Sequence, residues 1–365
     1  MAALVPEDLP IRDDLRGLSP YGAPQLDVPV QLNVNENPYP PSPAVVRAIA
    51  DAVAKSAASL NRYPDREAVA LRQALAAYLQ RREGVEFDAA QVWPANGSNE
   101  VMLQLMQAFG GPGRTALGFA PTYSMYPDYC RDTFTAYVTA ARDENFTVTA
   151  GIARAAIEAH QPDVVLLASP NNPTGTALDL VVVEAVCEAA PGIVVIDEAY
   201  AEFRRGGTPS ALTLLDRFPR LVVTRTMSKA FAFAGARLGY LVASPAVVDA
   251  VRLVRLPYHL SALTQAAATA AVVHSDELLG SVDTLRQERD ALVEWLRSRG
   301  HDVATSDANF VLFGRFTDRD AVWQGLLDRG VLIRQTGPDG WLRVSIGTAS
   351  EMMAFRTALE EVVPA

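Results

Sequence analysis

One lysine stands in a setting that suits chemistry at its amine. Lys229 follows an apolar run, residues 221–224, and lies among small and apolar residues, with hydroxyl groups at Thr226 and Ser228 and a guanidinium at Arg237. An apolar setting near other cations lowers the pKa of a lysine, so that its amine can attack a carbonyl. Two hydroxyls and an arginine suit a phosphate dianion. The pattern predicts pyridoxal 5′-phosphate held by Lys229 as a Schiff base.

Lysine is rare in this chain. The only two are Lys55 and Lys229, against thirty arginines. A single lysine on a strand-to-helix turn is usually just a surface residue. In a chain that otherwise uses arginine, a retained lysine more often does what arginine cannot, which is to lose its proton.

Two further polar clusters follow apolar runs. Residues 163–168 are followed by a turn that contains Asn172, and residues 193–196 are followed by Asp197 and, three positions on, Tyr200. At the carboxyl end of a strand the Asn172 side chain is available as a donor to a ligand, and a plain turn is the alternative, because asparagine is a common turn former. A carboxylate directly after four aliphatic residues is costly to bury unless it meets a cation. A protonated pyridine nitrogen is such a cation, so Asp197 is predicted to pair with it and Tyr200 to donate to the phenolic oxygen of the ring. A plain helix cap is the alternative for Asp197.

Small residues open the helix expected over 101–109. Gly97, Ser98 and Asn99 would expose backbone amides there, and free amides at a helix N-terminus bind phosphate. A simple cap by Ser98 or Asn99 is the alternative. Tyr123 follows another predicted strand, where it could stack on a planar ring or belong to the core.

Composition excludes several classes of protein. The chain has 365 residues, of which 49% are apolar and 20% charged, so a folded protein of about two domains is expected. The net charge of −10 argues against nucleic acid as the main partner. Cys130 and Cys187 form neither a metal nor a disulfide framework, four scattered histidines offer no metal spacing, and no apolar run reaches the roughly 18 residues of a membrane span. A cytoplasmic protein without a metal is expected.

Apolar runs at 115–119, 164–168, 193–196 and 221–224 alternate with segments of helical length. This pattern predicts an α/β fold, with a mostly parallel central sheet flanked by helices and ligands at the carboxyl ends of its strands. We expect an N-terminal arm over residues 1–44 that joins the small domain, a large domain over 45–274, and a small α+β domain over 275–365. The last would hold helices at 275–299, 318–329 and 350–362, and strands at 310–313, 331–334 and 341–345.

The chain resembles the fold type I pyridoxal-phosphate aminotransferases over nearly its whole length. Residues 226–235, Thr-Met-Ser-Lys-Ala-Phe-Ala-Phe-Ala-Gly, are similar to the lysine signature of the class II aminotransferases. Residues 16–21, the arm segment 32–38, residues 332–334 and residues 342–343 most resemble the histidinol-phosphate aminotransferase family in its actinobacterial form.

This resemblance implies an activity and a set of roles. The activity would be amino-group transfer between histidinol phosphate and 2-oxoglutarate, in histidine biosynthesis, by a homodimer. Lys229, Asp197 and Tyr200 would be catalytic. The cofactor would also contact Gly97, Ser98, Asn99, Tyr123, Asn172, Thr226, Ser228, Arg237 and, from the neighbouring subunit, Tyr63. The substrate would contact Tyr21, Asn35, Asn172, Arg334 and Arg343.

Three other functions are compatible with parts of the pattern. An aromatic-amino-acid (phenylalanine) aminotransferase shares the fold and most cofactor contacts. A threonine-phosphate decarboxylase also binds a phosphorylated amine, but it would not need an added 2-oxo acid. A non-catalytic nucleotide-binding module is disfavoured, because no Gly-x-Gly-x-x-Gly opens a helix after the first strand and Gly110–Gly113 lacks the Lys-Ser/Thr of a P-loop.

Overall fold

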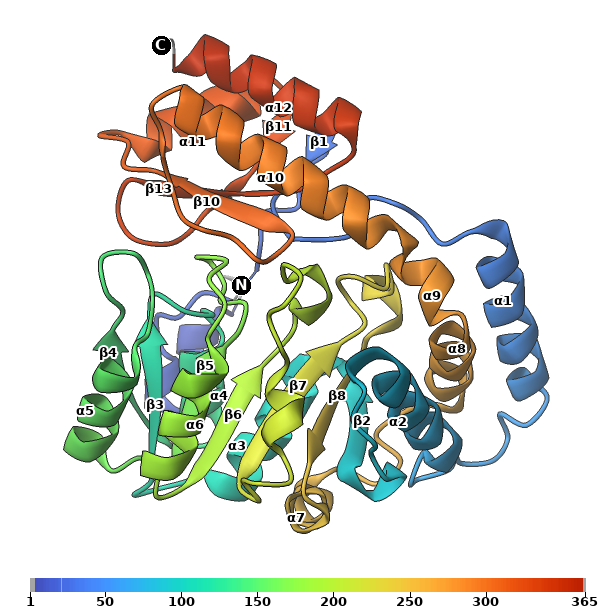
Figure 1. Cartoon of the computed structure of the whole chain (residues 1–365). Coiled ribbons are helices and arrows are strands. Elements are labelled where there is room, and N and C mark those ends of the chain that lie inside the picture. Colours follow the sequence, from blue (N-terminus) through green and yellow to red (C-terminus); the bar gives the residue numbers. More distant parts are fainter. Residues whose placement is uncertain (1–3, 21, 364–365) are drawn as a thin grey trace.

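A seven-stranded sheet forms the centre of the computed structural model, which describes residues 4–20 and 22–363 (Figure 1). Its strands lie in the order β2-β8-β7-β6-β5-β3-β4. Their bounds are β2 Val92–Asn96, β3 Thr115–Ala120, β4 Ala136–Ala141, β5 Val164–Ala168, β6 Ile193–Asp197, β7 Leu221–Thr226 and β8 Leu238–Ala243. Four of these are the predicted strands. The other three, β2, β4 and β8, lie at or near the two edges.

Only β8 among these seven strands runs against the others. It pairs antiparallel with both β2 and β7, while every other pairing in this sheet is parallel. The prediction of a mostly parallel sheet is confirmed. Because β8 is reversed, its first residue lies at the same edge as the last residues of its neighbours.

Helices cover both faces of the sheet, as the alternating pattern predicts. Side chains of one parity, including Val165, Val194 and Val223, share a core with helices α2, α5 and α6, while the other parity, including Val195 and Val222, packs against α3, α4 and α7. The helices are α1 Pro43–Ala57, α2 Val69–Glu83, α3 Gly97–Phe109, α4 Tyr126–Asp132, α5 Ala150–His160, α6 Leu180–Ala189, α7 Pro245–Val254 and α8 Ala262–Val273.

Local signals explain several helix ends. Ser42 caps α1 by accepting a hydrogen bond from the backbone N–H of Val45 at 3.2 Å, with Pro43 in the first turn. Helix α2 ends at Gly84, whose φ of 72° is the left-handed conformation that glycine adopts without strain. In the described part of the chain, no helix combines the length and the apolar character needed to cross a membrane.

A C-terminal layer, residues 302–362, lies above the carboxyl edge of the large sheet in Figure 1. Its four-stranded sheet has the order β12-β13-β10-β9. The arm joins this layer, because β1 pairs in parallel with β11. The bounds are β1 Val30–Gln31, β9 Asp302–Val303, β10 Phe310–Gly314, β11 Val331–Leu332, β12 Arg334–Gln335, β13 Trp341–Ser345, α11 Arg319–Asp328 and α12 Ala349–Val362.

Two predicted elements are wrong in detail. The helix predicted over 275–299 is broken into α9 Ser275–Leu278, a 3₁₀ turn over Leu279–Ser281, and α10 Val282–Ser298. Gly280 lies in that turn, and glycine is a poor helix former. The strand predicted over 331–334 is split between β11 and β12, which belong to different sheets.

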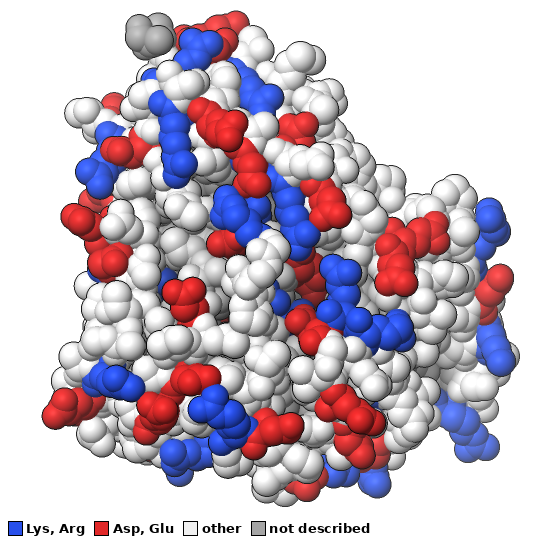
Figure 2. Space-filling view, viewed as in Figure 1, with Lys and Arg blue, Asp and Glu red and all other residues white. Residues whose placement is uncertain are grey.

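Charges of both signs are interspersed on the face shown in Figure 2. With a net charge of −10, the chain has no global field that would attract an anion. Any anionic ligand must therefore be held by cations and hydrogen-bond donors placed locally.

Candidate functional site

The carboxyl ends of the strands bring the predicted residues together. Ser98 follows β2, Tyr123 follows β3, Asn172 follows β5, Asp197 ends β6 and Lys229 follows β7. All five line one cavity of about 270 Å³. In a parallel sheet these ends share one edge, so residues far apart in the sequence converge there.

Most of the predicted site lines this cavity. The lining includes Asn35, Ser98, Asn99, Tyr123, Asn172, Asp197, Tyr200, Thr226, Ser228, Lys229, Arg237, Arg334 and Arg343. Gly97 directly precedes Ser98 at the start of α3. Tyr63 is not brought to the cavity: it is 79% exposed, stacks on Tyr258 with ring centroids 4.3 Å apart, and lines a separate groove. Tyr21 lies outside the described residues.

Lys229 forms a hydrogen bond with the N-terminal arm. Its Nζ donates a hydrogen bond to the backbone carbonyl of Val34 at 2.8 Å. Burial and then the charge of Arg343 lower the pKa of Lys229 to about 8, and Glu36 opposes this shift. A pKa near 8 leaves roughly a tenth of the amine unprotonated at pH 7, where an ordinary lysine would be almost fully charged.

The lowered pKa makes Lys229 a source of instability in the cofactor-free protein. Below pH 8 the amine is charged in both the folded and the unfolded chain, so folding carries the full free-energy cost of burying this charge. The cost decreases between pH 8 and the ordinary lysine pKa of 10.5. We expect Lys229→Met to raise the free energy of unfolding by about 1–3 kcal/mol at pH 7, and by progressively less towards pH 10. Urea denaturation at several pH values measures this. Lys55→Met, at an exposed position, is the control, and a Lys229→Met protein less stable than wild type at pH 7 would contradict the prediction.

Asp197 is a buried acid in a position where a neighbouring cation would stabilise its charge. It is 6% exposed, and it accepts hydrogen bonds from Thr224 Oγ1 at 3.1 Å and Tyr126 Oη at 3.3 Å. Burial raises the pKa of Asp197 to about 6, although these two hydrogen bonds lower it. A protonated ring nitrogen beside this carboxylate would favour its ionised form, so the site fits the pyridine end of pyridoxal phosphate.

The N-terminus of α3 forms a phosphate-sized cradle with Arg237. No side chain caps the helix at Asn96, and Ser98 and Asn99 of its first turn line the cavity, where free backbone N–H groups can bind an anion. Gly97 has a φ of +81°, and a Cβ there would lie 2.7 Å from Arg237 Nη2, so glycine lets the guanidinium approach the helix end. Arg237 Nη1 donates to Ser228 Oγ at 3.4 Å, and the backbone N–H of Ser228 donates to Thr226 Oγ1 at 3.1 Å. This donor set fits a phosphate.

The side of the cavity next to β13 is a chain of polar contacts. Arg343 Nη1 donates to Asn172 Oδ1 at 2.6 Å, and Asn172 Nδ2 donates to Tyr200 Oη at 3.5 Å. Arg343 Nη2 also donates to the carbonyl of Asn33 at 2.8 Å. On the opposite side, Tyr123 Oη donates to Asn99 Oδ1 at 3.4 Å.

Sequence reasoning missed several residues of the cavity. These are Ala23, Asn33, Val34, Thr122, Ser124, Ala168, Pro170, Ala199 and Thr336 in the lining, and Tyr126 behind Asp197. Asparagine recurs at 33, 35 and 37, and this repetition is a sequence signal for Asn33. Val34 acts through its backbone, which no residue type reveals.

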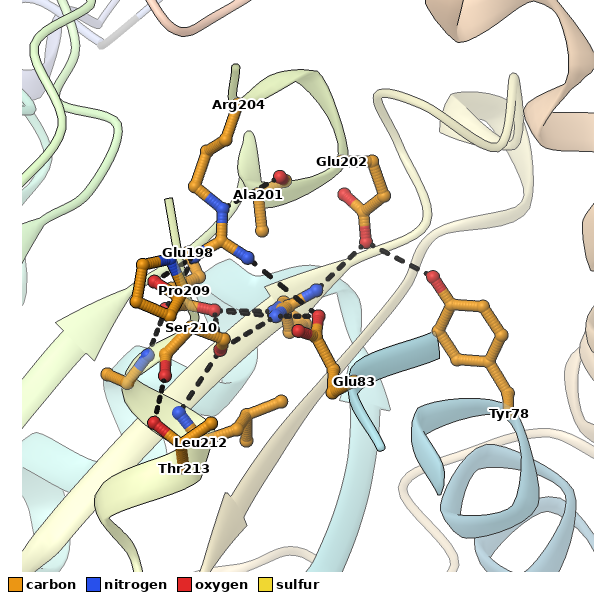
Figure 3. Close-up of polar contacts among 12 residues, drawn as sticks. Tyr78, Glu83, Glu198, Ala201, Glu202, Arg204, Pro209, Ser210, Leu212 and Thr213 are labelled. Carbon is orange, nitrogen blue, oxygen red and sulfur yellow. Dashed lines mark hydrogen bonds and ion pairs between the residues drawn. The ribbon is translucent and has the colours of Figure 1, made fainter. Parts of the chain in front are cut away.

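A buried ionic network lies behind the site (Figure 3). Alternate residues of a strand point to opposite faces, so Glu198 and Arg225 lie on the other side of the sheet from Asp197. Arg225 contacts Glu198 at 2.6 Å and Glu202 at 3.1 Å. It also contacts Glu83 at 2.7 Å. Arg204 adds a second guanidinium, 3.4 Å from Glu198. Burial alone would raise the pKa of Glu198, but Arg225 and Arg204 hold it below its ordinary value. The network ties the ends of β6 and β7 to α2.

The donor set therefore suits an organic phosphate with a reactive carbonyl. Among the described residues, no group of three or more histidines, cysteines or acids could hold a metal ion. The cavity has an anion cradle at one end, a carboxylate at another, and an amine of lowered pKa beside the arm.

Comparison with known proteins agrees with this geometry. Residues 28–359 match the family model for aminotransferase class I and II. The chain is 65% identical to a histidinol-phosphate aminotransferase of Thermobifida fusca over 353 residues, which cover 97% of this chain and 95% of that protein. It is 62% identical to histidinol-phosphate aminotransferase 3 of Burkholderia lata, covering 99% of this chain and 98% of that protein.

A solved structure has the same fold. The histidinol-phosphate aminotransferase of Sinorhizobium meliloti, in complex with pyridoxal 5′-phosphate, superposes with a TM-score of 0.82 at 26% identity, over 92% of this chain and 91% of that one. The family match covers most of the chain, and the matched relatives are covered almost completely. The chain therefore belongs to the class I and II aminotransferase family.

Proposed function

We propose that this enzyme transfers an amino group between histidinol phosphate and 2-oxoglutarate with pyridoxal 5′-phosphate as cofactor, in histidine biosynthesis. The names of its relatives from Thermobifida fusca and Burkholderia lata support this substrate. The solved Sinorhizobium meliloti relative, which binds pyridoxal 5′-phosphate, supports the cofactor.

One observation carries the choice of an anionic substrate. Arg334 and Arg343 are direct cross-strand partners on β12 and β13, and both line the cavity. Like charges directly opposite each other destabilise a sheet. Two arginines kept in this position suit a doubly charged group, and paired guanidinium forks bind phosphate and carboxylate alike. The phosphate of one substrate and a carboxylate of the other could thus use the same place.

The cofactor contacts follow from the donors of the cavity. The cradle of Ser98, Ser228 and Arg237 would hold its phosphate, Asp197 its ring nitrogen, and Tyr123 one face of its ring. Gly97, Asn99, Thr226 and Asn172 complete this set. The bound cofactor supplies an electron sink that acidifies the substrate carbon next to the amine.

Side chains of the protein supply the proton transfer and the orientation of the substrate. Lys229 Nζ, with a pKa of about 8, can hold a proton or release it near neutral pH, as a general base must. Asp197 keeps its charge when a cation faces it, and Tyr200 Oη offers a donor in the cavity that Lys229 also lines. Arg343 and Arg334 orient the substrate so that the carbon to be deprotonated faces Lys229. Tyr21 and Asn35 are further proposed contacts of the substrate.

A homodimer completes the proposal. Tyr63 is exposed, stacks on Tyr258 and lies outside the cavity of its own chain, which supports a role in a neighbouring subunit's site. We also propose a cytoplasmic enzyme whose arm (1–44) joins a small domain (275–365), beside a large domain (45–274).

A half-reaction tests the substrate. Protein loaded with pyridoxal 5′-phosphate is mixed with histidinol phosphate or with phenylalanine, without any 2-oxo acid, and the loss of the yellow absorbance is timed. We expect much faster bleaching by histidinol phosphate, and full turnover only after 2-oxoglutarate is added. Faster bleaching by phenylalanine would replace the proposal with an aromatic aminotransferase. Turnover without a 2-oxo acid would indicate a decarboxylase.

The variant Arg334→Gln tests whether Arg334 binds the anionic group of the substrate. It should raise the KM for histidinol phosphate by about tenfold or more, because one fork of the anion site is lost, and should affect bleaching by phenylalanine much less. Arg329→Gln is the control, since Arg329 lies in the same layer but pairs with Glu361 on the surface. Equal losses with both substrates would contradict the role given to Arg334.

A further inference from the structure

The polar groups of Asn35, in the arm, all form hydrogen bonds within the protein. It is 1% exposed. Its backbone N–H donates to Ser345 Oγ at 2.9 Å, and Ser345 Oγ donates back to Asn35 Oδ1 at 2.8 Å. Its Nδ2 donates to Tyr200 Oη at 3.0 Å, and its backbone carbonyl accepts from Asn309 Nδ2 at 3.1 Å. Asn35 thus connects the arm, β13 and the loop after β6.

The hydrogen bonds of this carboxamide give its orientation. Ser345 Oγ accepts from the backbone N–H of Asn35 and donates its own proton to Asn35 Oδ1. The amide oxygen thus lies at Ser345, and the NH₂ group faces Tyr200. An amide NH₂ only donates, so the hydroxyl oxygen of Tyr200 accepts and its own proton cannot point to Asn35.

Asn172 also presents its NH₂ group, a hydrogen-bond donor, to the hydroxyl of Tyr200. Its Oδ1 accepts from Arg343 Nη1 at 2.6 Å, which turns its NH₂ group toward Tyr200, although at the longer distance of 3.5 Å. Tyr200 Oη thus faces two amide donors and points its proton away from both. Tyr200 lines the cavity that also contains Lys229 and Asp197. Accepting hydrogen bonds polarises a hydroxyl and strengthens it as a donor.

We propose that Asn35 is a positioning residue, locked by Ser345, that turns the hydroxyl proton of Tyr200 toward the cofactor site and makes Tyr200 a hydrogen-bond donor there. This inference deepens the proposed function and rests on it. A donated hydrogen bond stabilises the ionised phenolic oxygen of bound pyridoxal phosphate. Asn35 therefore acts on the cofactor through Tyr200, in addition to any contact with substrate.

The backbone of Asn35 narrows the choice of test variants. Its φ of 57° is left-handed, a region that glycine, asparagine and aspartate tolerate best. Asn35→Gly keeps this backbone and removes the donor. Asn35→Asp keeps the size as well, but presents an oxygen that accepts the proton of Tyr200 and so reverses the hydrogen bond. Ser345→Ala leaves Asn35 in place and removes the hydroxyl that holds its amide oxygen.

The pH titration of the bound cofactor's visible absorbance is the readout, because it needs no substrate. We expect the midpoint to rise by about one pH unit in Asn35→Asp and by a smaller amount in Asn35→Gly and Ser345→Ala, since each weakens the donor to the ionised oxygen. The decisive measurement is a double-mutant cycle with Tyr200→Phe. If Asn35 acts through Tyr200, Asn35→Gly shifts the midpoint in the wild-type background and leaves it unchanged in Tyr200→Phe.

The same shift in both backgrounds, or none in wild type, would overturn the inference. If Asn35→Gly fails to fold, as judged by circular dichroism, the Ser345→Ala cycle gives the same decision. Failure of the proposed function has a different signature. A wild-type protein that never becomes yellow with pyridoxal phosphate refutes both, whereas additive shifts in a yellow protein refute only the role of Asn35.

Discussion

Replacing Lys229 by alanine should lower kcat/KM for amino-group transfer by at least about a thousandfold, because Lys229 supplies the only amine in the described lining of the cavity. Its Nζ lies inside the cavity with a pKa of about 8. The second lysine of the chain, Lys55, is exposed on α1. Arg343 and Arg237 also line the cavity, but a guanidinium stays charged and cannot act as a base.

The chain offers a matched control for this experiment. Lys55→Arg should keep wild-type kcat/KM. Borohydride reduction of the yellow protein, followed by peptide mapping, should locate the cofactor on Lys229 in wild type and in Lys55→Arg. A Lys229→Ala protein that kept activity within tenfold of wild type, or a cofactor mapped to Lys55, would refute the assignment.

Arg225→Met should cause the largest loss of stability among single changes near the site. The Arg225 side chain is 1% exposed and holds three carboxylates, those of Glu83, Glu198 and Glu202. Removing a buried cation leaves these charges uncompensated, which costs about 3–5 kcal/mol even when methionine fills the space. Arg204 can neutralise only part of this charge.

Urea denaturation of the cofactor-free protein measures the change. Arg217→Met is the control with the same substitution and the same kind of ion pair, 2.7 Å from Glu184, but with the Arg217 side chain 57% exposed. It should cost under about 1 kcal/mol. Equal losses in the two variants would mean that the buried network adds nothing beyond an ordinary surface pair.

Residues after parallel strands could be predicted from the sequence, because the fold class alone places those ends at one edge. Lys229, Asp197 and Asn172 were assigned in this way, and the structure brings them into one cavity. The reversed strand β8 was not predicted. Its residues are as apolar as those of its neighbours, and strand direction follows from connections that periodicity does not encode.

Contacts between distant segments were the least predictable. Arg225 meets Glu83 across 142 positions, and Asn35 meets Ser345 across 310. No local pattern specifies such pairs. The carbonyl of Val34 on Lys229 belongs to the same class, since every residue carries a carbonyl. The break at Gly280 did have a local signal, but the apolar pattern on both sides favoured one continuous helix.

The 310 positions between Asn35 and Ser345 also set an order of events during synthesis. The arm leaves the ribosome before the large domain, and its partner on β13 leaves after that domain. At about 5–20 residues per second, roughly 15–60 s separate the two. The phosphate cradle and Asp197 come from residues 97–237 and can assemble in that interval, while the part of the site built from the arm and β13 must wait. A nascent chain can thus fold its large sheet well before its active site is complete.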